Sequence, residues 1–204
     1  ISFSASLMVN DQLLKSLDHL QDVIETKATS LSEVVKTGRT HLMDAMPLTF
    51  GQELNAWASQ IKDIKSQFVA VLPNLQKLAL GGTAVGTGVN AHPQMSSKAT
   101  QILNEKTGMS FEPSVDRFRA ISSQDVSLDL SAKTRTLAVM LTKISNDLRW
   151  MNSGPLAGLG EIKLPALQPG SSIMPGKVNP VIPESVTMVS AQVIGNDTTI
   201  AIAA

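Results

Sequence analysis

The middle of the chain repeats its apolar residues at alternating steps of three and four, and this pattern constrains the fold most. The residues of this seam are Leu54, Trp57, Ile61, Ile64, Phe68, Val71, Leu75 and Leu78. A mean spacing near 3.5 residues is typical of helices that pack almost side by side in a bundle. With a rise of 1.5 Å per residue, this helix would be about 40 Å long. The seam therefore predicts a bundle of long helices.

Further segments show helical spacing as well. One follows Leu13 and continues loosely to Val35, a second covers about 126–151, and a third starts near Pro183. No segment alternates apolar and polar residues convincingly, as a half-buried strand would. The predicted fold class is therefore all-α, a long-helix bundle in which residues 1–204 form one central helical-bundle domain.

The composition excludes several classes of function. Seventeen Lys and Arg balance seventeen Asp and Glu, so the formal net charge is zero. Nucleic-acid binding and polybasic membrane anchoring need a surplus of positive charge, so we expect neither kind of partner. The chain has no cysteine, which excludes disulfides and thiolate catalysis and is compatible with a reducing compartment.

The two ends of the sequence are abrupt. It begins at Ile1 without an initiator Met, and it stops at Ala204 inside an apolar helical pattern. No capping residue, Gly or Pro closes that pattern. We therefore expect an internal fragment of a longer protein whose N-terminal and C-terminal domains are absent.

Three stretches between the predicted helices have the composition of loops: residues 38–47, 81–88 and 170–180. After the first, Thr49 and Gln52 have the spacing of a capping box, which predicts that a helix starts there. The second is rich in glycine but lacks the Gly-Lys-Ser/Thr ending of a phosphate loop and follows no predicted strand. It is interpreted as a wide turn between helices.

The third stretch places polar side chains between glycines and prolines. Ser171, Ser172, Lys177 and Asn179 offer hydroxyl, ammonium and amide groups, and the glycines leave backbone N–H groups accessible. Such a loop can bind an anion. The same composition is also typical of an ordinary surface loop, so both interpretations stay open at this point.

The chain has only three histidines. His19 is expected on a helix surface and His92 in a turn, whereas His41 precedes the capped helix in a non-helical stretch. There it could act as a general acid or base, although a lone histidine in a loop is more often structural than catalytic. Arg39 and Asp44 could simply pair with each other. No histidine or carboxylate spacing suggests a metal site, so no metal and no cofactor are expected.

Residues 170–180, GSSIMPGKVNP, resemble the GSSxMPxKxNP signature of the fumarase/aspartase superfamily. Residues 38–54, 80–90 and 146–155 are also similar to that superfamily, in the same order along the chain. The implied fold is the superfamily's central helical domain. Class II fumarases match best, because aspartate ammonia-lyases usually carry Gln at His41 and Ala at Gly176. Residues 179–184 are close to the sequence that ammonia-lyases carry at these positions, and some fumarases share that sequence.

The resemblance implies roles for the signature loop in reversible hydration of fumarate to (S)-malate. Ser171 would be the base that removes a proton next to a carboxylate. Lys177 and Asn179 would hold the carboxylate on which negative charge accumulates, assisted by Ser172 and the backbone of Val178. Charge that develops in the transition state must meet donors already in place.

The resemblance also implies that His41 protonates the departing hydroxyl, that Glu184 orients His41, and that Thr40 contacts the substrate.

The resemblance further implies that the protein is a hydro-lyase of the tricarboxylic acid cycle without a cofactor. It would be a homotetramer with each active site built from three subunits, located in the cytoplasm or, in a eukaryote, the mitochondrial matrix. The upstream Ser-Ser-Asn segment of family members has no counterpart here.

Two alternatives remain at this point. One is an aspartate ammonia-lyase or another C4-dicarboxylate lyase of the same fold. The other belongs to a different class and is a non-catalytic helical oligomerisation scaffold.

Overall fold

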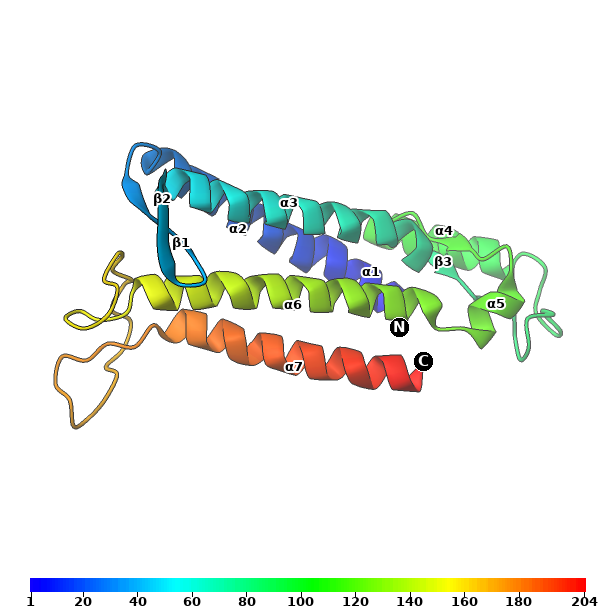
Figure 1. The fold of residues 1–204 in the computed structure, drawn as a ribbon. Coiled ribbons are helices and arrows are strands. Elements are labelled where there is room, and N and C mark those ends of the chain that lie inside the picture. Colours follow the sequence, from blue (N-terminus) through cyan, green and yellow to red (C-terminus); the bar gives the residue numbers. More distant parts are fainter. The chain divides into compact units, whose positions relative to one another are not determined.

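The computed structural model describes residues 1–204, which form long helices and two small sheets (Figure 1). The helices are α1 (Ser2–Met8), α2 (Leu14–Ser30), α3 (Phe50–Leu75), α4 (Met95–Thr107), α5 (Arg117–Ser122), α6 (Asp125–Met151) and α7 (Val181–Ala203), with a π-helical segment, η1 (Val9–Leu13), before α2. Strands β1 (Val35–Thr40) and β2 (Met43–Thr49) pair antiparallel, and β3 (Lys77–Leu78) and β4 (Glu112–Pro113) pair parallel. The all-α fold class is confirmed, and the short strands are additions that the apolar spacing did not predict.

The chain divides into two compact units. Unit 1 consists of Ile1–Gln21, Lys62–Lys133 and Thr199–Ala204, and unit 2 consists of Asp22–Ile61 and Thr134–Thr198. Every residue that the sequence suggested for the site lies in unit 2. No helix is long and apolar enough to cross a lipid bilayer.

The predicted seam forms the buried side of α3. Ile61, Phe68 and Leu75 along this helix are completely buried. The helix ends at Leu75 and does not reach Leu78 as predicted, because Leu78 pairs with Pro113 in the β3–β4 ladder. The helix predicted over 126–151 matches α6, and the one predicted near Pro183 matches α7.

The sequence interpretation was wrong about the end of the first helix and missed α4 and α5. Helix α2 ends at Ser30, whereas the spacing was extended to Val35, which instead begins β1 and pairs with Thr49. Helix α4 has little apolar periodicity because its sequence, MSSKATQILNEKT, is mainly polar. A mostly solvated helix leaves only a weak spacing signal.

The apolar core of unit 2 lies between α3 and the second half of α6. Trp57, Ile144 and Met151 are buried there. The half-buried side chains packed around them are Ile24, Phe50, Leu54, Met140, Leu148 and Ile162. Because Phe50 begins α3 and Met151 ends α6, this core reaches the end of unit 2 at which the β1–β2 hairpin lies (Figure 1).

The capping box is confirmed atom by atom. The backbone N–H of Gln52 donates to Thr49 Oγ1 at 3.1 Å, and the N–H of Thr49 donates to Gln52 Oε1 at 3.0 Å. Both donors would otherwise lack an intrahelical partner. Strand β2 therefore ends and α3 begins at a fixed point.

Thr49→Ala should loosen the start of α3. Loss of an N-cap hydroxyl costs about 1 kcal/mol, so amide hydrogen exchange in the first turn should become roughly fivefold faster. The measurement is native-state hydrogen exchange on the complete protein. Ser66→Ala is the matched control, because the exposed Ser66 hydroxyl bonds only to a carbonyl of its own helix, that of Asp63. Unchanged exchange at residues 50–53 in Thr49→Ala would show that the cap contributes nothing.

Candidate active site

Thr40 and His41 lie at the tip of the β1–β2 hairpin. Thr40 pairs with Met43, so His41 and Leu42 form the connecting turn, with φ of 53° and 62°. Positive φ at both central residues is the type I′ pattern, which normally selects Asn and Gly. A non-glycine residue held there costs of order 1–3 kcal/mol, and such strain clusters at functional sites. His41 therefore lies at a strained backbone position, and because its imidazole is exposed, side-chain packing does not explain why a histidine stands there.

Gly38 allows the two strands to approach closely. A Cβ at this buried position would lie 2.3 Å from the carbonyl oxygen of Met46 and 2.6 Å from Leu48 Cδ2. The pairing register also shifts between Thr37 and Arg39, where Gly38 alone lies opposite two residues of β2, Ala45 and Met46. Any larger residue would force the strands apart below the His41 tip.

Gly38→Ala is therefore expected to destabilise the protein by about 1–3 kcal/mol, the usual cost of overpacking against backbone. Thermal unfolding of the complete protein measures this change. Thr37→Ala is the matched control, because it introduces the same side chain in the neighbouring position without adding atoms, and it should cost less. Equal melting temperatures for Gly38→Ala and the unaltered protein would contradict the close approach.

The signature loop, residues 170–180, is closed between Gly170 and Lys177. The N–H of Gly170 donates to the carbonyl of Lys177 at 2.7 Å, and Pro169 pairs with Val178 in an isolated antiparallel bridge. Within the loop, the N–H of Lys177 donates to the carbonyl of Met174 at 3.2 Å. Pro175 and Gly176, with a glycine φ of 82°, occupy the central positions of this turn. Proline followed by glycine at positive φ is the type II pattern.

The loop gathers five of the predicted site residues. Ser171 is half-buried, and its Oγ accepts the N–H of Ile173 at 3.3 Å. Ser172, Lys177 and Val178 are exposed, and Lys177 forms no ion pair within the chain. Asn179 Nδ2 donates to the carbonyl of Gly170 at 3.4 Å. The loop therefore presents an ammonium group and hydroxyls to solvent, and the backbone hydrogen bond between Gly170 and Lys177 holds its two ends together.

Glu184 lies in the first turn of α7, immediately after the signature loop. Its N–H donates to the carbonyl of Pro180 at 3.1 Å, and its carbonyl accepts the hydroxyl of Thr187. No hydrogen bond or ion pair joins Glu184 to His41 within this chain. Their pairing therefore stays a prediction.

An ionic cluster that the sequence interpretation missed lies below the hairpin tip. It consists of Lys36, Arg39, Glu53 and Glu161. Arg39 also lies 3.9 Å from Asp44, the partner that the sequence suggested, but its shorter contact is with Glu161 at 2.8 Å. Arg39 and Glu161 are 122 positions apart, so no local pattern could reveal their contact.

The other two histidines have surroundings of the kind predicted for them. His19 is exposed on α2, and His92 Nδ1 accepts the backbone N–H of Gln94 in a turn. Residues 81–88 form turns without a regular helix or strand, as interpreted. The structure contains no group of three or more His, Cys, Asp or Glu side chains arranged to hold a metal ion.

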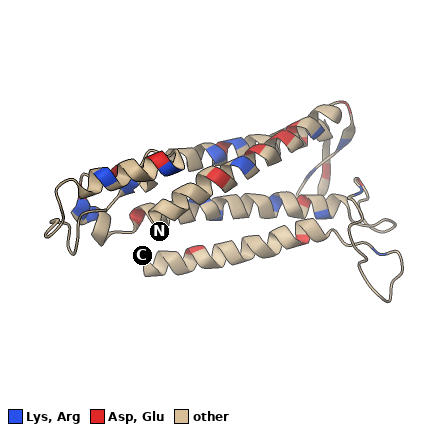
Figure 2. Cartoon of the chain, turned by 180° about the vertical axis from the view of Figure 1, so that it is seen from behind, with Lys and Arg blue, Asp and Glu red and all other residues tan.

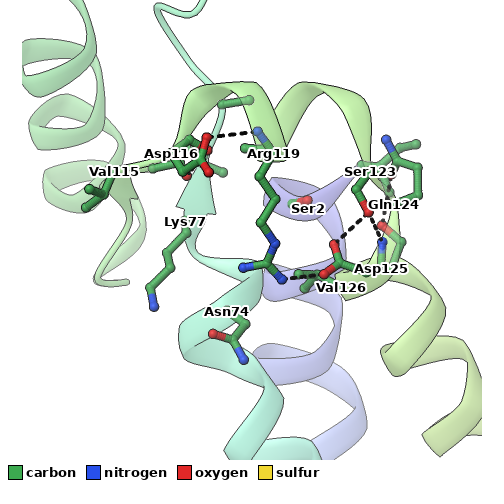
Figure 3. Close-up of a pocket in the computed structure, with 16 residues that line it drawn as sticks. Ser2, Asn74, Lys77, Val115, Asp116, Arg119, Ser123, Gln124, Asp125 and Val126 are labelled. Atoms are coloured by element: carbon green, nitrogen blue, oxygen red, sulfur yellow. Dashed lines mark hydrogen bonds and ion pairs between the residues drawn. The ribbon is translucent and has the colours of Figure 1, made fainter. Parts of the chain in front are cut away.

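A separate cavity of about 560 Å³ lies in unit 1 and contains none of the predicted site residues. Figure 3 shows the Arg119 side chain extended along it to Asp125. The hydrogen bond from Arg119 lowers the pKa of Asp125, and the same bond raises the pKa of Arg119. Any stability that Asp125 adds is thus present above its unfolded pKa and is lost as pH falls through the lowered value. Both groups are solvent-exposed, and such pairs contribute little.

Comparison with known proteins gives consistent results. A family model described as Lyase matches residues 1–195. "Fumarate hydratase class II 2" of Pseudomonas aeruginosa is 58% identical over 203 residues, which is 100% of this chain and 44% of that protein. "Fumarate hydratase class II" of Bacillus subtilis is 45% identical over 201 residues, 98% of this chain and 44% of that protein. The chain thus spans less than half the length of these curated relatives.

Solved structures agree in fold. A recombinant class II fumarase from Schistosoma mansoni superposes with a TM-score of 0.93 at 37% identity, covering 100% of this chain and 46% of that one. Fumarate lyase:delta crystallin from Brucella melitensis, bound to cobalt, superposes with a TM-score of 0.92 at 42% identity, covering 98% of this chain and 44% of that one. These findings confirm the resemblance inferred from the GSSIMPGKVNP signature. The chain belongs to the Lyase family.

Proposed function

We propose that the complete protein catalyses the reversible hydration of fumarate to (S)-malate. The observation that carries this proposal is the closed signature loop with Ser171, Lys177 and Asn179, in a chain 58% identical to a class II fumarate hydratase. His41, where ammonia-lyases usually carry Gln, favours the hydratase within the family.

The signature loop supplies the groups for proton removal. Ser171, as an alkoxide, takes the proton from the carbon next to one carboxylate of malate. The electron pair left behind spreads onto that carboxylate, which Lys177 and Asn179 hold, with Ser172 and the Val178 backbone assisting. Fixed donors at the site of growing charge lower the barrier most, because they need no reorganisation during the reaction.

The hairpin tip supplies the second half of the reaction. As the carbon–oxygen bond breaks, His41 gives a proton to the departing hydroxide, which leaves as water, and fumarate forms. In the reverse direction the neutral imidazole removes a proton from the attacking water. Glu184 orients the imidazole and stabilises its charged form, and Thr40 contacts the substrate.

Self-association to a homotetramer accounts for the surface of α7. Between Val181 and Ala203 this helix carries only two charged residues, Glu184 and Asp197, and appears almost uncharged in Figure 2. Asp197 is buried against Arg135 at 2.8 Å. Ile182, Met188 and Val189 remain exposed. A helix that is apolar on most sides must be buried on most sides, and other copies of the chain would bury it.

We also propose that the enzyme is located in the cytoplasm.

The test is to give the complete protein (S)-malate and L-aspartate in separate assays and follow the ultraviolet absorbance of fumarate. Malate should yield fumarate at a rate proportional to enzyme, and aspartate should yield none. Fumarate from aspartate alone would identify an ammonia-lyase. Fumarate from neither substrate would favour the scaffold alternative.

A further inference from the structure

The ionic cluster of Lys36, Arg39, Glu53 and Glu161 joins three separate segments of unit 2. Lys36 Nζ lies 2.6 Å from Glu53 Oε2 and 3.4 Å from Glu161 Oε2, and Arg39 Nη1 donates to Glu161 Oε1 at 2.8 Å. The two cations belong to β1, Glu53 to the first turn of α3, and Glu161 to the segment between α6 and the signature loop. Glu161 is the member that contacts both cations.

The cluster is largely shielded from water. The side chains of Lys36 and Glu161 are only 7% and 13% exposed, and Glu161 Oε2 is buried without accepting a hydrogen bond. Buried charges are tolerated only where partners stay in place, and removal of one partner leaves the others uncompensated. The ion pairs of Lys36 and Arg39 with Glu161 therefore hold β1 in place relative to Glu161.

Apolar packing covers little of the hairpin near its tip. Leu42, Met43 and Met46 are all more than 60% exposed. A cavity of about 540 Å³ lies along the hairpin, and its lining includes Lys36 and Glu161. Beyond the cluster, Lys36 Nζ contacts Met151 Sδ at 3.2 Å and lies 5.0 Å from the centre of the Phe50 ring. Lys36 and Arg39 therefore attach β1 to α3 and to the segment after α6 through charge.

Glu161 itself is anchored to a rigid element. Its backbone N–H donates to the carbonyl of Met151, the last residue of α6, at 2.8 Å. Its side chain then reaches Arg39, which precedes His41 by two positions in the sequence. A continuous path of bonds thus runs from the end of α6 through Glu161 and Arg39 to the strained turn.

We propose that Glu161 is a positioning residue that holds the Thr40–His41 tip in its catalytic orientation through Arg39 and Lys36. This inference rests on the proposed role of His41 in proton transfer. In this role Glu161 acts on the rate through the geometry of His41 and not through contact with the substrate. A displacement of about 1 Å in a catalytic group is enough to cost on the order of 100-fold.

The test is a double-mutant cycle in the complete enzyme with Glu161→Gln and His41→Asn. Glu161→Gln alone should lower kcat for malate about 10- to 100-fold and change KM less than about threefold. In the His41→Asn background the same substitution should change kcat less than about twofold, because the group that it positions is gone. Asp147→Asn is the matched control: it removes a carboxylate paired with Lys143 on α6, and kcat should be unchanged.

Each outcome of the cycle decides between interpretations. Equal fold-losses from Glu161→Gln in both backgrounds, or no loss in either, would overturn the positioning role. An unchanged kcat in His41→Asn alone would overturn the proposed function instead. If Glu161→Gln does not fold, Arg39→Lys keeps the charge but removes the guanidinium geometry. It should then lower kcat only when His41 is present, and an equal loss in both backgrounds would overturn the inference.

Discussion

Replacing Ser171 with alanine is expected to lower kcat for malate dehydration by about three to four orders of magnitude. A positioned general base contributes up to about 10⁴-fold, and no other hydroxyl on the signature loop has the same location. The KM for malate should change far less, because Lys177 and Asn179 still hold the carboxylate. Such a pattern identifies an interaction used mainly in the transition state.

The fold should tolerate Ser171→Ala. The only hydrogen bond that the Ser171 side chain makes in the structure is the one accepted from Ile173 at 3.3 Å, whereas the loop is closed by Gly170 and Lys177 through their backbones. Ser30→Ala is the matched control, since the exposed Ser30 hydroxyl bonds only to the carbonyl of Lys27. Steady-state kinetics with both variants check the expectation, and a Ser171→Ala enzyme within tenfold of the unaltered rate would rule out Ser171 as the base.

His41→Asn should lower kcat about 10²- to 10⁴-fold, the range expected when a general acid or base is lost. Asparagine is also among the residues that best tolerate the positive φ of a type I′ turn. Because His41 has a φ of 53°, the variant hairpin should be at least as stable as the original. Activity and stability should therefore change in opposite directions.

Paired measurements of turnover and thermal unfolding distinguish this outcome from simple damage to the hairpin. His92→Asn is the matched control, because it makes the same exchange in a turn of unit 1 and should leave turnover unchanged. A His41→Asn enzyme that melts several degrees lower and loses activity in proportion would indicate a structural role for the imidazole.

The sequence predicted the long helices better than the local geometry of the segments that carry the proposed site residues. The apolar seam of α3 and the spacing in α6 identify these helices, because each buries one stripe over many turns. The β1–β2 hairpin leaves no such signal. Its strands are largely exposed, and its pairing depends on the register shift opposite Gly38 and on a strained turn, neither of which produces period-two alternation.

The glycines and prolines of residues 170–180 predicted a specialised loop, but not that Gly170 and Lys177 would close it. The contact of Glu161 with Arg39 could not be predicted either, because it joins residues 122 positions apart through charge. The distances from His41 to Ser171 and Glu184 in the active site could not be predicted for a different reason. If separate copies contribute them, no property of one chain can reveal their distance.

We propose that Ser171 and His41 serve the same active site and that different copies of the chain contribute them. Complete enzymes carrying Ser171→Ala or His41→Asn can be co-expressed with different affinity tags, so that mixed assemblies are purified through both tags. Each variant alone should be nearly inactive. Mixed assemblies should recover about a quarter of the unaltered rate, since chance then pairs an intact Ser171 with an intact His41 in about that share of sites. Mixed assemblies that remain as inactive as either parent would contradict a shared site built from separate copies.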